Sequence, residues 1–388
     1  MSRARAFIAA LLAGAVLGPA PTAVSATEVT VGEVMSGALL GATGASRTEI
    51  DAAEVLALSD EMRRFLRDHV NRGAPEGFKM QQLIDAMMGS DDFVLEYDEN
   101  TRTAAETFRL RRGNCLSFTI LFVSLARGAG LDARFQEVDI PADWSTGEGV
   151  FVLNRHINVF VDLGMSGTRA VDFNIGDFKS NFEIEQISDR RAIAHFFNNM
   201  GVERMQAGDI VGSVVYFRQA IVSSDGDFSP AWTNLGLLYR HAGLLEHAEV
   251  AYLEAMRVES GNYVAMSNLA TLYEERGEAE LAERYRGKVR RHRLRNPHLR
   301  YRLAQQAYAD REYHAAIDHL RFAIRKARDK PEYSLLMAKC LLHTGNETKA
   351  RAWLAKAQAR AEDEGQAERY SAEFEALADE LSIDGADL

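Results

Sequence analysis

A cysteine in the first half of the chain stands where a reactive thiol would be useful. Cys115 follows Gly113-Asn114 directly and opens the apolar run from Leu116 to Ala126. Backbone N–H groups at the start of a helix are unpaired and favour negative charge. The thiolate is the nucleophilic form of cysteine, so this position predicts an activated cysteine whose pKa lies below the ordinary value of about 8.5.

A nucleophile of this kind needs a base and a group that orients the base. His156 lies in the strand-like stretch NRHINVFVDL, where His156, Asn158 and Phe160 would share one face. Asp172 follows in RAVDFN, a spacing that suits a neighbouring strand, and could hold the tautomer of the imidazole. Taken one at a time, the cysteine, the histidine and the aspartate each have an ordinary structural explanation. A buried cysteine, for example, is usually inert. Their combination predicts acyl-transfer chemistry.

Helix and strand signals surround these residues. Ser59-Asp60-Glu61 predicts the start of a helix through EMRRFLRDHV, and FKMQQLIDAMM predicts another. Strands are expected over DFVLEY, DARFQEVDI, NVFVDL and RAVDFNI. Gly128 and Gly130 mark the end of the cysteine helix. This order of elements predicts an α+β domain over residues 27–185.

A period of about 34 residues runs through the second half. Small residues recur at spacings of 35, 34, 34 and 34, namely Gly201, Gly236, Ala270, Ala304 and Ala338. Seven residues later a glycine follows in four of the five units. Small residues suit the contact between two helices and glycine suits the turn. The pattern predicts five stacked helix pairs over residues 190–362, capped by an amphipathic helix within 363–388.

The third repeat departs from the pattern of the others. Arg286 stands where Phe217 and Tyr252 stand in earlier units, and it belongs to a basic run from Arg284 to Arg302. Such a run is either a solvated helix face or a docking patch for an anionic partner or lipid head group.

The cysteine, histidine and aspartate motifs resemble those of the transglutaminase-like superfamily, which has a papain-like core. The resemblance covers about residues 90–180 and rests on RRGNCLSFTILFVSLARGAGLDARFQEV, NRHINVFVDL and RAVDFN. It implies Cys115 as nucleophile, His156 as base and Asp172 as orienting group. Asp162 is the rival for the third role, although it ends the histidine strand and would point away.

Two departures from that family leave the oxyanion donors open. Asn158 stands where the family often carries tryptophan, and no tryptophan precedes Cys115. The backbone N–H of Cys115 remains a candidate donor, and Asn158 or Gln136 is a candidate for the second.

The second half resembles the tetratricopeptide repeat family over about residues 195–360, which implies a superhelix with a concave binding groove. Asn199, Asn234 and Asn268 occupy one position in three successive repeats, and the resemblance places that position in the groove. An asparagine amide can match a backbone peptide unit, so these residues are candidate ligands for a peptide or protein. The alternative is a role in helix packing.

The first 26 residues have the pattern of a secretory signal peptide. Arg3 and Arg5 precede the short apolar run Ala6 to Leu17, and Val24-Ser25-Ala26 offers a cleavage site. Export across the inner membrane is expected, with a mature chain that begins at Thr27 in the periplasm. The alternative is an uncleaved membrane anchor.

Composition and missing motifs narrow the function further. The formal charge is −11, or −11 − 2 = −13 without the two early arginines, so nothing favours nucleic acid. No later stretch is apolar enough to cross a membrane. There is no HExxH, paired CxxC or phosphate-binding glycine loop, and hence no metal or cofactor is expected.

Two functions follow from these features. The first is a secreted cysteine-dependent enzyme that transfers acyl groups or hydrolyses amides of a peptide or protein, with the repeats as its binding module. The second is a catalytically inactive papain-like scaffold that serves protein–protein interaction. The complete Cys–His–Asp set favours the enzyme, whereas the unassigned oxyanion donor favours the scaffold.

Overall fold

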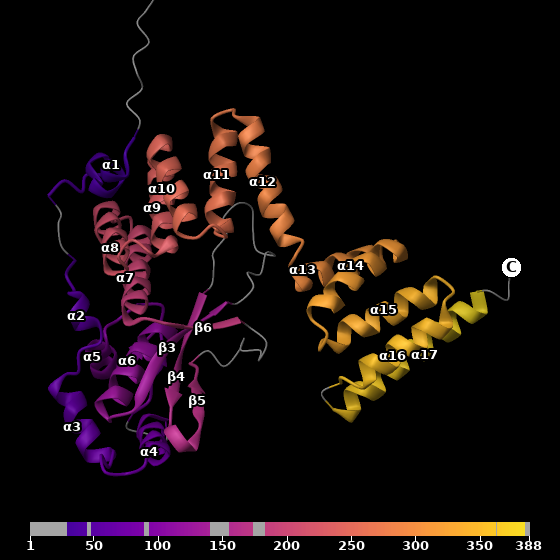
Figure 1. The fold of residues 1–388 in the computed structure, drawn as a ribbon, viewed down its shortest axis with the longest axis horizontal. Helices are drawn as coiled ribbons and strands as arrows, with labels where there is room; N and C mark the ends of the chain where they lie inside the picture. Colours follow the sequence, from indigo (N-terminus) through magenta and orange to yellow (C-terminus); the bar gives the residue numbers. More distant parts are fainter. Residues whose placement is uncertain are drawn as a thin grey trace, which may run out of the picture.

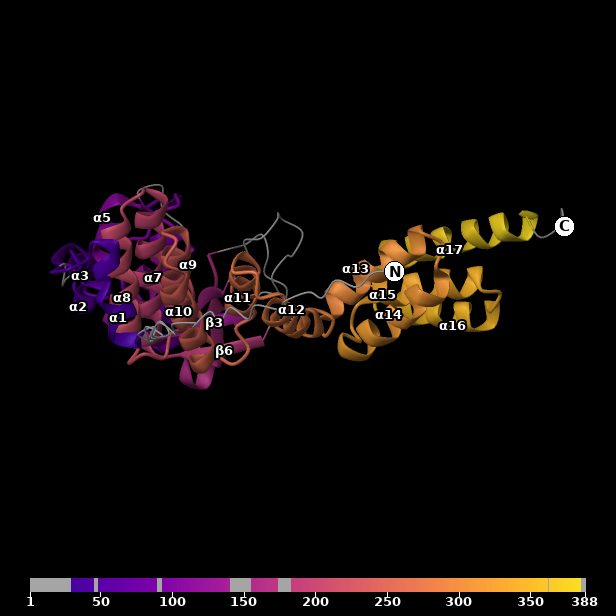
Figure 2. The same cartoon turned by 90° about the horizontal axis from the view of Figure 1, so that it is seen from above.

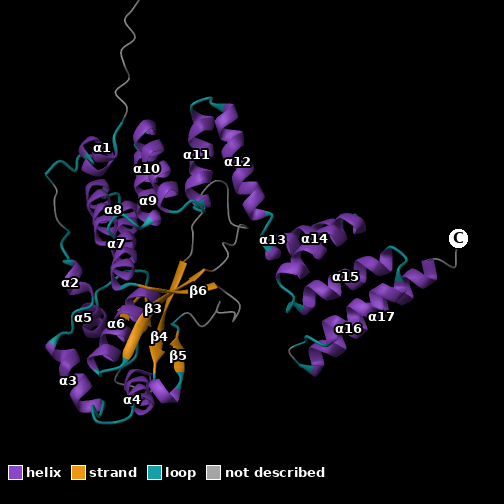
Figure 3. Cartoon of the chain, in the orientation of Figure 1, coloured by secondary structure: helices purple, strands orange, loops and turns teal. Residues whose placement is uncertain are grey.

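The computed structural model describes residues 29–44, 48–88, 93–139, 155–173, 183–361 and 363–384. The expected signal peptide, residues 1–26, lies outside the described residues. A small region that contains a sheet is followed by a long helical region, as Figures 1 and 3 show. The predicted combination of an α+β region with an all-α solenoid is thereby confirmed.

The described part of the first region contains, up to residue 128, six α-helices and one 3-10 turn. They are α1 (Val31–Ser36), η1 (Ala38–Leu40), α2 (Ala52–Val55), α3 (Asp60–His69), α4 (Glu76–Met88), α5 (Ala104–Leu110) and α6 (Cys115–Gly128). Ser59 caps α3, where its side chain accepts a hydrogen bond from the N–H of Met62. Every residue of α6 from Leu116 to Ala126 is buried, because α3, α4 and α5 pack against it on one side and the sheet on the other.

The main sheet is antiparallel, with the strand order β5-β4-β3-β6. Its strands are β3 (Asp132–Asp139), β4 (Arg155–Asp162), β5 (Thr168–Val171) and β6 (Glu183–Ile187), with a 3-10 turn η2 (Gly164–Ser166) between β4 and β5. A second, parallel pair joins β1 (Glu96–Tyr97) to β2 (Arg112–Gly113). The strand predicted over DFVLEY is therefore only two residues long.

Ten helices form five consecutive antiparallel pairs within residues 183–361. The pairs are α7 (Asp189–Gln206) with α8 (Ile210–Ser223), α9 (Ser229–His241) with α10 (Leu245–Val258), α11 (Tyr263–Glu275) with α12 (Ala279–Arg293), α13 (Pro297–Ala309) with α14 (Tyr313–Lys326), and α15 (Pro331–His343) with α16 (Glu347–Gln358). The last helix, α17 (Glu364–Asp384), packs on α15 and α16 and so covers the end of the solenoid (Figure 2).

The small residues of the repeat lie where the two helices of a pair meet. A Cβ atom added to Gly201 would lie 2.6 Å from the ring of Phe217, and one added to Gly236 would lie 2.7 Å from the ring of Tyr252. These contacts leave no room for a side chain, which explains why the repeat keeps glycine at both positions.

The first region and the early repeats share one apolar core. Helix α1 packs against α10, and the hydroxyl of Tyr239 donates a hydrogen bond to the carbonyl of Val34 at 2.7 Å. On the other side, Glu137 of β3 forms ion pairs with Arg191 and His195 of α7. The predicted boundary between residues 185 and 190 thus falls inside a continuous core.

Candidate functional site

The local sequence places Cys115 at the first position of α6. Asn114 is the N-cap, and its side-chain oxygen accepts a hydrogen bond from the N–H of Ser117 at 2.9 Å. Its amide nitrogen donates to the hydroxyl of Thr101 at 2.8 Å, which anchors the cap. Gly113 fits because a Cβ atom there would lie 2.6 Å from the Cβ of Ser117.

Two hydrogen bonds fix how α6 lies along the sheet. The hydroxyl of Thr119 lies 3.1 Å from the carbonyl oxygen of Ile157, and the Nε of Arg127 donates to the carbonyl of Ala133 at 2.8 Å. Ala133 pairs with Val161, so α6 and β4 run in the same direction. From Thr119 to Arg127 the helix rises about 12 Å. From Ile157 to Val161 the strand rises about 13 Å, which is close to the rise of the helix between its two contacts with the sheet.

This register places Cys115 level with the start of β4. The cysteine precedes Thr119 by one helical turn, about 6 Å, which corresponds to about two strand residues before Ile157. That level is the position of Arg155, the first residue of β4, and His156 is the next residue along the strand. Thr119 was not singled out from the sequence, although a hydroxyl one turn after the cysteine in an apolar helix was the available signal.

His156, Asp172 and Asn158 form one hydrogen-bonded group. The Nε2 of His156 lies 2.6 Å from Oδ1 of Asp172, and the amide nitrogen of Asn158 donates to Oδ2 of the same carboxylate at 3.2 Å. The side chains of His156 and Asp172 are only 9% and 15% exposed. With Nε2 engaged by the carboxylate, Nδ1 is the nitrogen that remains for a thiol proton. Asp162, the rival, instead accepts from the N–H of Gly164 at 2.9 Å.

The electrostatics of Cys115 differ from the sequence-based prediction. Burial and the negative charge of Asp172 raise the pKa of the Cys115 thiol above its ordinary value. The backbone N–H of Cys115 itself acts in the opposite direction but is outweighed. The prediction of a lowered pKa is therefore wrong, because burial and a nearby carboxylate exceed the effect of the helix start.

Tyr97 also belongs to the surroundings of the thiol. Its side chain is 65% exposed. The pKa of its phenol is raised, mainly by partial burial and next by the negative charge that an ionised Cys115 would carry. Parallel pairing of β1 with β2 brings it here, since Tyr97 is in register with Gly113. The short β1 segment gave no sequence signal for this approach.

The two candidates for a second oxyanion donor lie on neighbouring strands. Asn158 is fully buried and stands opposite Gln136 in the register of β4 and β3. The amide of Asn158 donates to Asp172, so the structure gives it a positioning contact with the aspartate. Gln136 is 8% exposed.

The three repeat asparagines have different environments. Asn199 on α7 is half-buried, while Asn268 on α11 is buried. The amide nitrogen of Asn234 on α9 donates to the side-chain oxygen of Asn198 at 2.9 Å. Asn198, which the repeat period did not single out, is thus the hydrogen-bond partner of Asn234.

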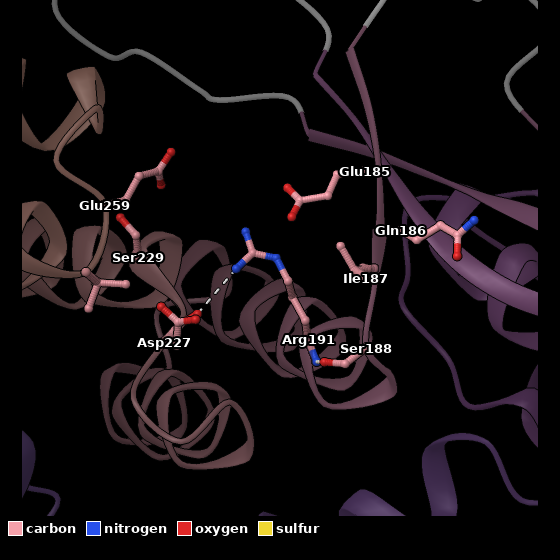
Figure 4. Close-up of a pocket in the computed structure, with 9 residues that line it drawn as sticks. Glu185, Gln186, Ile187, Ser188, Arg191, Asp227, Ser229 and Glu259 are labelled. Carbon is pink, nitrogen blue, oxygen red and sulfur yellow. Dashed lines mark hydrogen bonds between the residues drawn. The ribbon is translucent and has the colours of Figure 1, made fainter.

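A polar cavity of about 380 Å³ lies where the sheet meets the repeats. Figure 4 shows Glu185, Arg191, Asp227 and Glu259 around it, with Gln186 turned away. Arg191 donates to the carbonyl oxygen of Asp227 at 3.3 Å. Across the sheet, Ile184 of β6, Val138 of β3 and His156 of β4 share one register. Two strand spacings, about 10 Å, therefore separate the strand beside the cavity from that of His156.

Neither a metal cluster nor a membrane-spanning helix occurs in the part of the chain that the structure describes. Those residues contain no group of three or more His, Cys, Asp or Glu that could hold an ion. None of the helices there is long and apolar enough to cross a bilayer. Both cysteines are free thiols.

Comparison with family models identifies both regions. Residues 65–163 match the transglutaminase-like superfamily, a range that includes Cys115 and His156 and ends before Asp172. Residues 229–262 and 307–372 match models of the tetratricopeptide repeat. The chain thus joins a transglutaminase-like domain to tetratricopeptide repeats, a combination that supports a protein-binding module.

Solved structures similar to the chain are helical repeat proteins. They include pilF of Pseudomonas aeruginosa, at 16% identity over 51% of this chain and 92% of that chain, with a TM-score of 0.26. MamA from Desulfovibrio magneticus RS-1 has 12% identity over 45% and 96%, with a TM-score of 0.25. YrrB, described as a TPR protein with an unusual peptide-binding site, has 15% identity over 46% of this chain and 91% of that chain, with a TM-score of 0.25. At TM-scores this low, the repeat assignment stands on the family models. A search of curated proteins finds no match.

Proposed function

We propose that the protein is a cysteine-dependent enzyme that transfers acyl groups from, or hydrolyses, amides of a peptide or protein. The hydrogen bond between His156 and Asp172, one residue along β4 from the level of Cys115 at the start of α6, carries the proposal. This arrangement supplies a nucleophile, a base and a group that fixes the tautomer of the base.

The raised pKa of Cys115 decides how the first step proceeds. Burial and the charge of Asp172 favour the neutral thiol, so we propose that the proton leaves during the attack rather than before it. Sγ bonds to the carbonyl carbon while Nδ1 of His156 accepts the thiol proton. The resulting imidazolium, paired with Asp172, returns the proton to the leaving amine as the C–N bond breaks. A thioester remains on Cys115, and water or an amine then releases the acyl group.

The repeats and the nearby cavity support a peptide or protein as substrate. A chain held along Asn199, Asn234 and Asn268 would lie on the first three repeats, which share their core with the catalytic region. The cavity beside β6 offers polar side chains about 10 Å from the histidine strand, within reach of an extended peptide. We also place the enzyme in the periplasm, on the signal-like pattern of residues 1–26.

The test is product formation from a mixture of glutamine-containing peptides with and without a fluorescent primary amine. Mass spectrometry distinguishes deamidation, cleavage and amine incorporation. We expect one of these products with the wild-type chain and none with Cys115→Ala. Equal product from both chains, or none from either, would overturn the proposal.

The inactive scaffold is the second candidate, and the raised pKa of Cys115 is the observation that favours it. Peptide binding by the repeats is expected of the scaffold and of the enzyme alike, so it does not distinguish the two candidates. Thioester formation on Cys115 separates the two, because only the enzyme requires His156 for it.

A further inference from the structure

The solenoid is interrupted between its third and fourth repeats. Consecutive repeats elsewhere pack closely, as α8 does on α9, α10 on α11, and α14 on α15, whereas α12 and α13 make only weak contact. The apolar core divides at the same place: one cluster ends with Ala282 and the next begins with Ala304. In Figures 1 and 2 the last two repeats extend away from the first three.

The interruption coincides with the departure of the third repeat from its pattern. Phe217 and Tyr252 fill the space beside Gly201 and Gly236 in the first two repeats. In the third, Arg286 takes the aromatic position and its guanidinium turns to Glu274 in an ion pair. The replacement of a ring by a charged side chain leaves the space beside Ala270 open.

A cleft of about 400 Å³ occupies this open space. Its apolar lining includes Val289 of α12 and three half-buried leucines, Leu294, Leu299 and Leu303. Arg286 and Arg290 stand at its rim with side chains that are 44% and 67% exposed. Arg286 pairs with Glu274 and Arg290 with Glu283, and both guanidinium groups stay partly exposed. The cleft is therefore apolar inside, with two partly exposed arginines among the residues that line it.

The basic character extends beyond the rim. Residues 284–302 contain nine Lys and Arg and no Asp or Glu, in a chain whose net charge is −11. A local excess of positive charge on an acidic protein attracts anionic partners. Two members of this basic run, Arg286 and Arg290, are among the residues that line the apolar cleft.

We propose that this cleft, lined by Val289, Leu294, Leu299 and Leu303 and rimmed by Arg286 and Arg290, binds an acidic amphipathic helix of a partner protein. At every other junction the surface of one repeat is covered by a helix of the next. A helix added here would supply the missing packing, with its apolar face in the cleft and its carboxylates on the arginines. This site is separate from Cys115 and does not depend on its chemistry.

A designed peptide tests the proposal on the full chain. The probe is a fluorescein-labelled helix with leucines along one face and glutamates on the flanks, titrated by fluorescence anisotropy. We expect saturable binding that Arg286→Glu with Arg290→Glu weakens at least tenfold. Arg321→Glu is the matched control, because Arg321 is 69% exposed and lies outside the cleft. It should change the affinity less than twofold. All variants must keep the wild-type melting temperature.

Three outcomes would overturn the proposal. The first is a scrambled peptide, with leucines all round the helix, that binds equally well, since that would reduce the site to charge alone. The second is an equal loss with Arg321→Glu. The third is saturable binding to phosphatidylglycerol vesicles but not to the peptide, which would make the patch a lipid site. Cys115→Ala should bind the probe like wild type, so failure of the enzymatic proposal leaves this test intact.

Discussion

The two cysteines show what position does to the same side chain. Cys340 lies inside α15, fully buried among repeat residues, and burial raises its pKa to about 12. Cys115 stands at the start of α6, only partly buried, level with the start of β4 and acted on by the charge of Asp172. Burial raises the pKa of both thiols, and Cys115 differs in standing at the start of a helix where the charge of Asp172 acts on it.

The largest expected effect on chemistry comes from the base. His156→Ala should slow acylation of Cys115 by about 10²–10⁴-fold, the usual contribution of a general base. The rate is measured as phenolate release from an activated aryl ester. His241→Ala, at the exposed end of α9, is the control and should leave the rate unchanged. Similar rates in all three chains would mean that His156 takes no proton.

The largest expected effect on stability comes from the junction of sheet and repeats. Burial alone would raise the pKa of Glu137, but its bonds to His195 and its ion pair with Arg191 outweigh burial and bring it to about 2. Removal of one partner from such a buried pair costs about 3–5 kcal/mol. Glu137→Ala should therefore lower the free energy of unfolding in urea by that amount. Glu185→Ala, its exposed register neighbour on β6, should cost less than about 0.5 kcal/mol.

The same group gives a pH dependence with a definite sign. Because the folded pKa of Glu137 is lowered, its stabilisation is present above the unfolded value of about 4.3 and is lost as pH falls toward about 2. The acid side of the stability curve should flatten in Glu137→Ala. If the free energy of unfolding falls equally steeply with pH in wild type and Glu137→Ala, protonation of Glu137 does not cause the loss of stability in acid.

A smaller effect is expected from the repeat asparagines. Each hydrogen bond contributes about 0.5–1.5 kcal/mol, so Asn199→Ala, Asn234→Ala and Asn268→Ala together should weaken binding of a substrate peptide at least tenfold. The melting temperature should change little. Asn198→Ala is the control, since it removes only the partner of Asn234. If Asn198→Ala loses as much peptide affinity as the triple variant, the three repeat asparagines act in helix packing rather than in peptide binding.

The smallest expected effect distinguishes two roles of Asp172, its charge acting on the Cys115 thiol and its orientation of His156. The charge of Asp172 raises the pKa of Cys115, so Asp172→Asn should move the midpoint of alkylation against pH downward. The same change should slow acylation, because His156 loses its carboxylate partner. A midpoint that moves upward would instead indicate a resting imidazolium–thiolate pair.

Most of the fold could be predicted from periodicity and capping. The 34-residue repeat gave the helix pairs because contact between paired helices demands small residues at fixed positions, as Gly201 and Gly236 show. Ser59 and Gly130 likewise marked helix ends through local backbone chemistry. Contacts between distant segments could not be read in this way. The packing of α1 on α10 and the ion pairs of Glu137 depend on surfaces that meet only in the folded chain.

The candidate site divides along the same line. Residue types and order were enough to propose Cys115, His156 and Asp172, because acyl transfer restricts which side chains can serve, and the structure joins His156 to Asp172 by a hydrogen bond. The direction of the thiol pKa was missed, since it depends on how deeply Cys115 is buried and how near Asp172 lies. Tyr97 was missed for a similar reason, because its approach rests on a two-residue strand pairing.

Formation of a thioester on Cys115 tests the central claim most directly. The folded chain is treated with an activated aryl ester at neutral pH, quenched in acid and mapped by mass spectrometry. Attack by Sγ forms the S–C bond, the C–O bond breaks with loss of the phenolate, and the thiol proton passes to His156. We predict one acyl group on Cys115, none on Cys340, and loss of the adduct in His156→Ala. Equal acylation of Cys115 in wild type and His156→Ala, or acylation of lysines alone, would contradict the proposed site.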